Sequence, residues 1–269
     1  MTAQRLDAAL AARGLARSRT HAATLIAAGG VTVDGRPVVK SSVKVGDDAV
    51  LEVASSDHYV SRAAHKLIAG LDGFGVEVEG RVALDAGAST GGFSQVLLER
   101  GVKQVLAVDV GHGQLAPQLA DAAGLVLVEG CNVRNLDAAR IAELTGVAER
   151  PSLVVADLSF ISLTVVLPAL RATATDDADF VLLVKPQFEV GRGGAREGVV
   201  RDAGLRADAV SNVLWAAFDA GLGTAGILSS PIVGGHGNVE YLVHLSAVRG
   251  VNPTEWSGRV DEVTGRAKA

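Results

Sequence analysis

The chain has 269 residues, 48% of them hydrophobic and 20% charged, which is enough for one large domain or two unequal domains with packed cores. Its formal net charge is −5, and its one cysteine, Cys131, excludes an internal disulfide and a cysteine-rich metal site. The chain contains no run of about 18 uncharged apolar residues and starts without a hydrophobic signal segment. We therefore expect a cytoplasmic protein with no membrane contact and no metal.

The positive charge gathers at the front of this acidic chain. Residues 1–66 hold nine Lys and Arg residues against six Asp and Glu residues, whereas the remainder is strongly acidic. A basic surplus confined to one region is typical of a part that binds nucleic acid.

Residues 1–56 predict a small α+β domain. Apolar residues at 6, 9 and 10 predict a first helix, and Ser18 can cap a second helix that ends at Gly29-Gly30. The run from Val31 to Val39, with Asp34-Gly35 in its middle, predicts a β-hairpin. We therefore expect two short helices followed by a small sheet.

This module resembles an S4 RNA-binding domain. The resemblance lies in Arg13-Gly14-Leu15-Ala16-Arg17-Ser18-Arg19, then Ala22, Leu25-Ile26, Gly29 and Val31-x-Val33-Asp34-Gly35. It implies RNA contacts from the basic residues of the region, for which we select Arg5, Arg13, Arg17, Arg19, Lys40 and Arg62. A dimerisation or purely structural unit is the alternative.

Residues 57–61 predict a linker, and residues 62–269 predict a larger second domain. Nearly unbroken apolar runs alternate with helical patterns, which indicates a mostly parallel sheet covered on both faces. An antiparallel last strand would begin at the edge where the other strands end. The strands are expected at 81–84, 105–108, 125–128, 153–156, 180–184 and 239–245.

Residues 84–93, Leu-Asp-Ala-Gly-Ala-Ser-Thr-Gly-Gly-Phe, join a predicted strand to a predicted helix. Such a turn presents backbone N–H groups to a ligand. Ser89 replaces the middle glycine of a dinucleotide fingerprint, and Phe93 follows the glycines where a phosphate-binding loop has lysine. Carboxylates at Asp85 and Asp109 suit a cation and a ribose, so we predict S-adenosylmethionine; a glycine-rich turn without a ligand is the alternative.

Charged residues lie at the ends of several predicted strands. Asp157 and Lys185 each follow a strand, and Glu240 opens the last one, so all three can share one rim with Lys66 from the preceding helix. Transfer of a methyl group to a hydroxyl needs a base, and a lysine that has lost its proton can serve. Each charge taken singly is more often an ordinary surface charge, and the functional reading depends on their coincidence at one edge.

Other methyl acceptors are disfavoured. Methylation of exocyclic amines usually uses an Asp/Asn-Pro-Pro-Tyr/Phe turn, and here the sequence is Asp157-Leu158-Ser159-Phe160. Carbon methylation needs a nucleophilic cysteine, but no acid or base is patterned around Cys131, which reads as a neutral thiol. A hydroxyl acceptor is what remains.

Almost the whole chain resembles the TlyA (hemolysin A) family of ribosomal RNA 2′-O-methyltransferases. The motifs are Ser61-Arg62-x-x-His65-Lys66-Leu67, residues 84–93, Ala156-Asp157-Leu158-Ser159-Phe160-Ile161-Ser162, Val184-Lys185-Pro186-Gln187-Phe188-Glu189 and Gly237-Asn238-Val239-Glu240-Tyr241. The resemblance implies a Rossmann-like class I methyltransferase domain behind the S4 domain. It also implies a catalytic tetrad of Lys66, Asp157, Lys185 and Glu240, with Lys185 as the base. For the cofactor site we select Asp85, Gly87, Ser89, Thr90, Gly91, Phe93, Asp109, Asn132 and Asp157.

The resemblance further implies ribosomal RNA or ribosomal subunits as partners. The complete N-terminal helix is similar to the longer actinobacterial form, which implies cytidine ribose in both 16S and 23S RNA as the target. In the linker, the family has Arg-Ala-Trp-Val, whereas this chain has Asp57-His58-Tyr59-Val60. The basic stretch 191–201 is expected either to touch substrate or to be a solvated loop. A non-catalytic ribosome-assembly factor is the main alternative, and a pore-forming haemolysin is disfavoured by the missing membrane segment.

Overall fold

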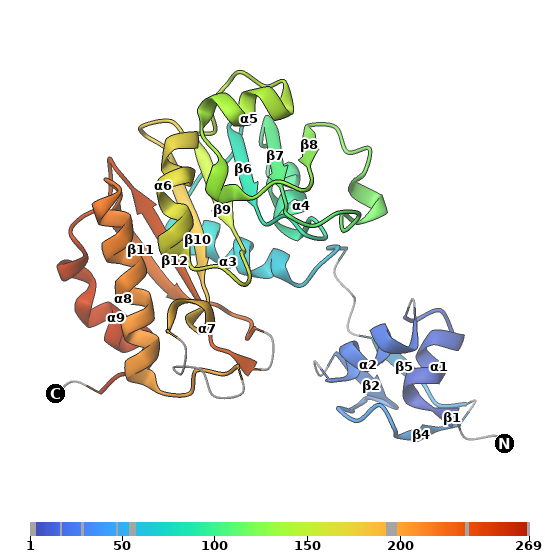
Figure 1. The fold of residues 1–269 in the computed structure, drawn as a ribbon. Helices are drawn as coiled ribbons and strands as arrows, with labels where there is room; N and C mark the ends of the chain where they lie inside the picture. The colour runs from blue at the N-terminus through green and yellow to red at the C-terminus, as the bar shows by residue number, and fades with distance from the viewer. Residues whose placement is uncertain are drawn as a thin grey trace. The chain divides into compact units, whose positions relative to one another are not determined.

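The computed structural model describes residues 4–16, 18–27, 30–46, 48–53, 58–191, 198–234 and 237–267. The chain divides into two compact units, residues 1–58 and 59–269 (Figure 1). Within the described residues, no helix is long and apolar enough to cross a membrane.

The first unit has the helices and the hairpin that its sequence predicts. Ser18 Oγ accepts a hydrogen bond from His21 N at 3.1 Å in the first turn of the second helix. Asp34 and Gly35 have φ angles of 50° and 74°, the left-handed pair that a tight hairpin turn requires. The elements are β1 (Gln4–Arg5), α1 (Leu6–Ala12), α2 (Arg19–Ala27), β2 (Val31–Val33), β3 (Arg36–Pro37), β4 (Lys44–Val45) and β5 (Leu51–Val53).

These elements enclose a small core of their own. The strands form a three-stranded sheet in the order β3-β2-β5 and a two-stranded sheet of β1 and β4. Leu6 and Leu10 from α1 and Ile26 from α2 are completely buried against Val31 of β2. The apolar spacing of the two helices therefore produces this packing.

The second unit is built on a seven-stranded sheet in the order β11-β12-β10-β9-β6-β7-β8. All described strand pairs of this sheet are parallel except those that β12 makes with β10 and β11. The elements are α3 (Ala63–Phe74), β6 (Val82–Ala86), α4 (Gly92–Glu99), β7 (Gln104–Val108), β8 (Leu125–Val128), α5 (Ala138–Thr145), β9 (Leu153–Ala156), α6 (Leu163–Thr173), β10 (Asp179–Val184), α7 (Pro186–Glu189), α8 (Ala203–Asp219), β11 (Gly223–Ser229), β12 (Tyr241–Ser246) and α9 (Ser257–Thr264).

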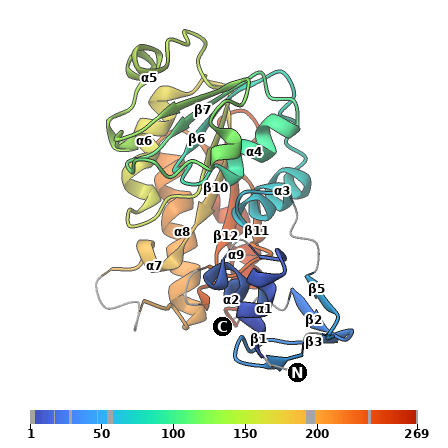
Figure 2. The ribbon, with the colours of Figure 1, turned by 90° about the vertical axis from the view of Figure 1, so that its right-hand side faces the viewer.

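Helices cover both faces of this sheet, as the unbroken apolar strands predict. Helices α3 and α4 lie on one face, and α5, α6 and α8 lie on the other (Figure 2). Alternate residues of β6 serve the two cores: Ala83 faces α3 and α4, whereas Leu84 faces the opposite layer. The strand residues are almost all buried because neither face meets solvent.

One strand, β11, was not predicted. It contains Gly223 and Gly226, and glycine weakens the strand signal in a sequence. A Cβ atom on Gly223 would lie 2.4 Å from the carbonyl carbon of Gly250. The glycine therefore permits a close backbone approach beside β11 at the cost of a recognisable strand pattern.

Candidate active site

Four charged side chains from distant parts of the chain meet at one edge of the sheet. Asp157 follows β9, Lys185 follows β10, and Glu240 precedes β12. Because β9 and β10 are parallel and β12 is antiparallel to β10, the ends of the first two and the start of the third lie at the same edge. Lys66 reaches this edge from the first half of α3.

These four residues form a chain of alternating charges. Lys66 Nζ lies 2.6 Å from Glu240 Oε2 and 3.8 Å from Asp157 Oδ2. The other oxygen, Asp157 Oδ1, lies 2.5 Å from Lys185 Nζ. All four side chains are at most 16% exposed. Two cations and two anions thus neutralise one another in a place where an unpaired charge would be costly.

Two adjoining cavities open beside Asp157. The larger has a volume of about 660 Å³, and the smaller has about 180 Å³. They share the lining residues Gly87, Ser89, Asp157 and Ser159, and Lys185 lines the smaller one. A cavity of several hundred Å³ suits a nucleoside-sized ligand. The smaller cavity leaves space beside Lys185.

The glycine loop forms one wall of these cavities. Gly87 has φ 85°, and a Cβ atom there would lie 3.1 Å from the carbonyl oxygen of Asp157. Glycine is therefore needed where the loop after β6 meets the loop after β9. Of the other predicted loop residues, Ser89 lines both cavities, Thr90 and Phe93 line the smaller one, and Gly91 (φ 92°) lines neither and caps α4 instead.

Asp109 lies at the end of β7 and lines the larger cavity. Its Oδ2 accepts a hydrogen bond from Ser89 N at 2.8 Å, and its Oδ1 accepts one from Gly111 N at 2.7 Å. Ser89 has a left-handed φ of 47°, and its Oγ donates to Gln114 Oε1 at 3.1 Å. The carboxylate is thus oriented by backbone N–H groups at the point where the sequence predicts a ribose contact.

Asn132 and Cys131 line the same larger cavity. Asn132 Oδ1 accepts from Arg134 N at 3.1 Å, so its amide is already oriented by its own turn. Burial raises the pKa of the Cys131 thiol, which agrees with the neutral thiol predicted from its surroundings in the sequence.

Asp85, which we predict as a cofactor contact after the first strand of the second unit, lines neither cavity. It is the fourth residue of β6 and is completely buried. Ser94 Oγ donates to its Oδ2 at 2.6 Å, whereas Oδ1 has no hydrogen-bond partner among the described residues. Burial raises the pKa of Asp85 to about 7, with smaller contributions from Asp157 and Asp109.

The predicted RNA-binding residues have different surroundings. Arg5 and Arg19 both bind the carboxylate of Asp7, at 3.0 and 3.2 Å, and these contacts lower the pKa of Asp7 to about 2. The side chains of Arg5 and Arg19 remain partly exposed, at 43% and 61%. Arg13 donates to the carbonyls of Ala49 and Gly46, so it also closes a turn of its own unit.

Lys40 and Arg62 are exposed, whereas Arg17 lies outside the described residues. Asp57 of the predicted linker and residues 192–197 of the predicted basic loop also lie outside them. The RNA contacts of all six basic residues stay predictions.

Two residues to which the sequence assigned no role lie in the site. Ser159 Oγ accepts a hydrogen bond from Lys185 Nζ at 2.9 Å. Phe160 has φ 64°, is 92% exposed, and packs against Phe188 with a ring-centroid distance of 5.3 Å. A single exposed apolar side chain is common on protein surfaces, so it is the place of Phe160 at the larger cavity that makes it a candidate for a ligand contact. The residue types alone carry no signal for this left-handed turn.

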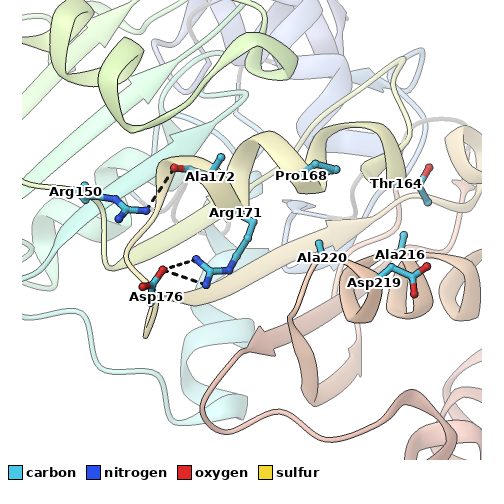
Figure 3. Close-up of a pocket in the computed structure, with 9 residues that line it drawn as sticks. All are labelled: Arg150, Thr164, Pro168, Arg171, Ala172, Asp176, Ala216, Asp219 and Ala220. Carbon is cyan, nitrogen blue, oxygen red and sulfur yellow. Dashed lines mark hydrogen bonds and ion pairs between the residues drawn. The ribbon is translucent and has the colours of Figure 1, made fainter.

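A separate hollow of about 740 Å³ lies between α6 and α8 (Figure 3). Arg150 donates to the carbonyls of Ala172 and Ala174 at the end of α6, and Arg171 binds Asp176 at 3.2 Å. Both arginines of this hollow therefore already bind nearby groups of the protein. The hollow contains none of the tetrad residues, and we do not assign the reaction to it.

Known proteins resemble this chain along almost its whole length. Residues 59–247 match the family of FtsJ-like methyltransferases, and residues 4–51 match the S4 domain. The 16S/23S rRNA (cytidine-2′-O)-methyltransferase TlyA of Mycobacterium tuberculosis is 50% identical over 244 residues, which cover 90% of this chain and 89% of that protein. Hemolysin A of Brachyspira hyodysenteriae is 38% identical over 90% of this chain and 99% of its own. A solved structure from Streptococcus thermophilus, described as a hemolysin candidate, has a TM-score of 0.76 and 36% identity, and the match covers 99% of this chain and 96% of that one.

Proposed function

The chain belongs to the TlyA family of FtsJ-like methyltransferases, and we propose that it transfers a methyl group from S-adenosylmethionine to the 2′-hydroxyl of a cytidine ribose in ribosomal RNA. The observation that carries this proposal is the buried chain Glu240–Lys66–Asp157–Lys185, which reaches the cavities through Asp157 and Lys185. The named activity of the Mycobacterium tuberculosis relative supports 16S and 23S RNA as the substrates.

The larger cavity fits the cofactor. Asp109 and Asp157 present carboxylates to it, and the glycine loop presents backbone to it. Carboxylates favour ribose hydroxyls and a cationic group over a phosphate. When bound, S-adenosylmethionine supplies the methyl group, and its sulfur leaves as a neutral thioether.

The residues of the tetrad divide the remaining work. Lys185, which lines the smaller cavity, first gives up its own proton to solvent, and its amine then takes the proton of the 2′-hydroxyl so that the oxygen's electron pair can form the new bond to carbon. Asp157 holds Lys185 on one side and approaches Lys66 on the other. Glu240 keeps Lys66 paired, so that the site stays near neutral.

The acceptor side of the site also suits RNA. Enzymes that modify single nucleotides commonly unstack the target base and hold it against an aromatic ring. Phe160 offers such a ring, since it is 92% exposed and lines the larger cavity. The S4 unit would add phosphate contacts through its exposed arginines.

The acceptor atom can be tested by alkaline hydrolysis. A free 2′-hydroxyl attacks the neighbouring phosphate in alkali, so a ribose-methylated nucleotide stays linked to its 3′ neighbour. Ribosomal subunits treated with the protein and labelled S-adenosylmethionine should therefore yield a labelled, alkali-stable dinucleotide. Lys185→Ala should lose this product and keep cofactor binding.

Two results would contradict the proposal. Label in mononucleotides alone would place the methyl group on a base. Cofactor and ribosome binding without any methyl transfer by the unaltered protein would favour the alternative of a non-catalytic assembly factor.

A further inference from the structure

We infer that Ser159 is a positioning residue that aims the nitrogen of Lys185 at the acceptor hydroxyl. The inference rests on the proposed function, because it takes Lys185 as the base. It starts from one contact: Lys185 Nζ donates to Ser159 Oγ at 2.9 Å while Asp157 Oδ1 lies 2.5 Å from the same nitrogen.

The two contacts restrict how the amine can point. A lysine nitrogen has one bond to carbon and three further positions, which hold three protons in the ammonium or two protons and a lone pair in the amine. Ser159 Oγ accepts one of these protons, whereas Asp157 Oδ1 holds Nζ by an ion pair and has no hydrogen-bond partner among the described residues. Ser159 Oγ is thus the acceptor that orients the amine, and the lone pair takes a position that Ser159 leaves open.

This arrangement matches the proton transfer. The O2′–H bond breaks as a new N–H bond forms at the lone pair of Lys185 Nζ, and the oxygen's electron pair attacks the methyl carbon. Lys185 is then an ammonium with three donors, which returns its extra proton to solvent. Without Ser159, one proton of the amine would have no fixed acceptor, and the lone pair would spend less time directed at the hydroxyl.

The fold holds Ser159 in this position. Phe160 has a left-handed φ of 64°, and at this turn Ser159 lines both cavities while Phe160 lines the larger one and stays 92% exposed. A non-glycine residue keeps such a backbone conformation only when its surroundings enforce it. The hydroxyl of Ser159 is thus placed by the loop that follows β9.

A second set of contacts ties the same loop to the segment after Lys185. The Glu189 carboxylate, at the end of α7, accepts hydrogen bonds from Ser162 Oγ and from Leu163 N, the latter at 2.9 Å. Ser162 Oγ also caps α6 by accepting from Thr164 N at 3.1 Å. The loop after β9 and the segment after β10 are therefore joined twice, by Ser159 with Lys185 and by Ser162 with Glu189. The second contact helps to fix the separation of Ser159 and Lys185.

The test compares Ser159→Ala, Ser159→Thr and the control Ser257→Ala with the unaltered protein. Ser257 is exposed at the start of α9 and donates to Thr254 O within its own turn at 3.0 Å. Ser159→Ala should lower kcat on ribosomal subunits on the order of tenfold to hundredfold. The KM for the subunits, the Kd for S-adenosylmethionine and the Tm should stay unchanged. Ser159→Thr keeps the hydroxyl and should restore most of the rate.

Three results would overturn the inference. The first is a Ser159→Ala rate equal to or above that of the unaltered protein. The second is a rate loss in Ser159→Ala that comes with a lower Tm or weaker cofactor binding, and the third is a Ser159→Thr rate that stays as low as that of Ser159→Ala. A higher rate would mean that the hydroxyl donates to the lone pair and competes with the substrate. The variant Lys185→Ala separates this failure from a failure of the proposed function. If Lys185→Ala is active, Lys185 is not the base and the proposed mechanism is wrong. If Lys185→Ala is inactive but Ser159→Ala is as fast as the unaltered protein, only the role of Ser159 is wrong. If Ser159→Ala does not fold, Ser159→Gly takes its place.

Discussion

Lys66 and Glu240 form a buried ion pair of 2.6 Å although 174 residues separate them in the chain. Their side chains are 7% and 2% exposed. The pair joins α3, the first helix of the second unit, to the residue that precedes β12, the last strand of that unit. A buried ion pair gives little net stability, but removal of one partner leaves a buried charge without compensation. Stability and activity should therefore respond differently to changes at this pair.

Glu240→Leu should destabilise the second unit by about 3–5 kcal/mol, because Lys66 loses its nearest anion. The double variant Lys66→Met/Glu240→Leu should recover most of that loss, while both variants lose methyl transfer. Urea unfolding followed by tryptophan fluorescence measures this, since the two tryptophans, Trp215 and Trp256, lie in the second unit. Equal destabilisation of the single and double variants would contradict a paired buried charge.

Asp109→Ala should weaken S-adenosylmethionine binding by about 1.5–3 kcal/mol, the value of hydrogen bonds to a charged group. The carboxylate lines the larger cavity and is oriented by Ser89 N and Gly111 N. Asp121→Ala, at an exposed position that does not line the cavity, is the matched control. Calorimetry that finds the same affinity for Asp109→Ala and the control would remove Asp109 from the cofactor site.

The methyltransferase sheet could be predicted because its strands are continuous apolar runs, which only a sheet buried on both faces accommodates. The charged residues after β9 and β10 could also be placed, since parallel strands end at one edge. The environment of Asp85 could not be predicted, because its burial depends on how far β6 extends beneath α4. The same limit applies to Ser159 and Phe160, whose orientations depend on a left-handed turn that no residue type in the loop indicates.

Arg5 and Arg19 should contribute to RNA binding by neutralising phosphates. Replacement of both by alanine should reduce the slope of log K against log salt by about 0.7–0.9 for each phosphate that an arginine no longer neutralises. Cofactor affinity should not change. Arg140→Ala, an exposed arginine on α5 paired with Glu143, is the control in the other unit. An unchanged slope in the double variant would mean that the S4 unit binds RNA through other residues.

Phe160→Ala should weaken productive RNA binding by about 1–3 kcal/mol, the value of one base–aromatic stack. The loss should appear as a higher KM for the RNA substrate, with the cofactor Kd unchanged. Phe218→Ala removes another partly exposed ring, on α8 and outside the two cavities, and serves as the control. If both variants have the KM of the unaltered protein, Phe160 does not hold the target base.

Asp85 should make the stability of the second unit depend on pH. Its pKa is raised from 3.8 to about 7 by burial, so the folded state keeps the carboxyl protonated at pH values where the unfolded chain ionises it. The group therefore favours folding most below about pH 4, and this contribution disappears as pH rises through about 7. A shift of this size corresponds to roughly 4 kcal/mol, of which roughly 3 kcal/mol falls between about pH 5 and pH 8.

Asp85→Asn removes this titration while its side-chain oxygen can still accept the hydrogen bond from Ser94. The variant should therefore gain stability relative to the unaltered protein as pH rises, because the groups that do not interact with Asp85 titrate equally in both chains and cancel in the difference. Urea unfolding of both proteins at pH 5 and pH 8, followed by tryptophan fluorescence, measures that difference. A stability difference that is the same at both pH values would mean that Asp85 is already ionised in the folded protein at pH 5, with its second oxygen stabilised by a partner such as bound water.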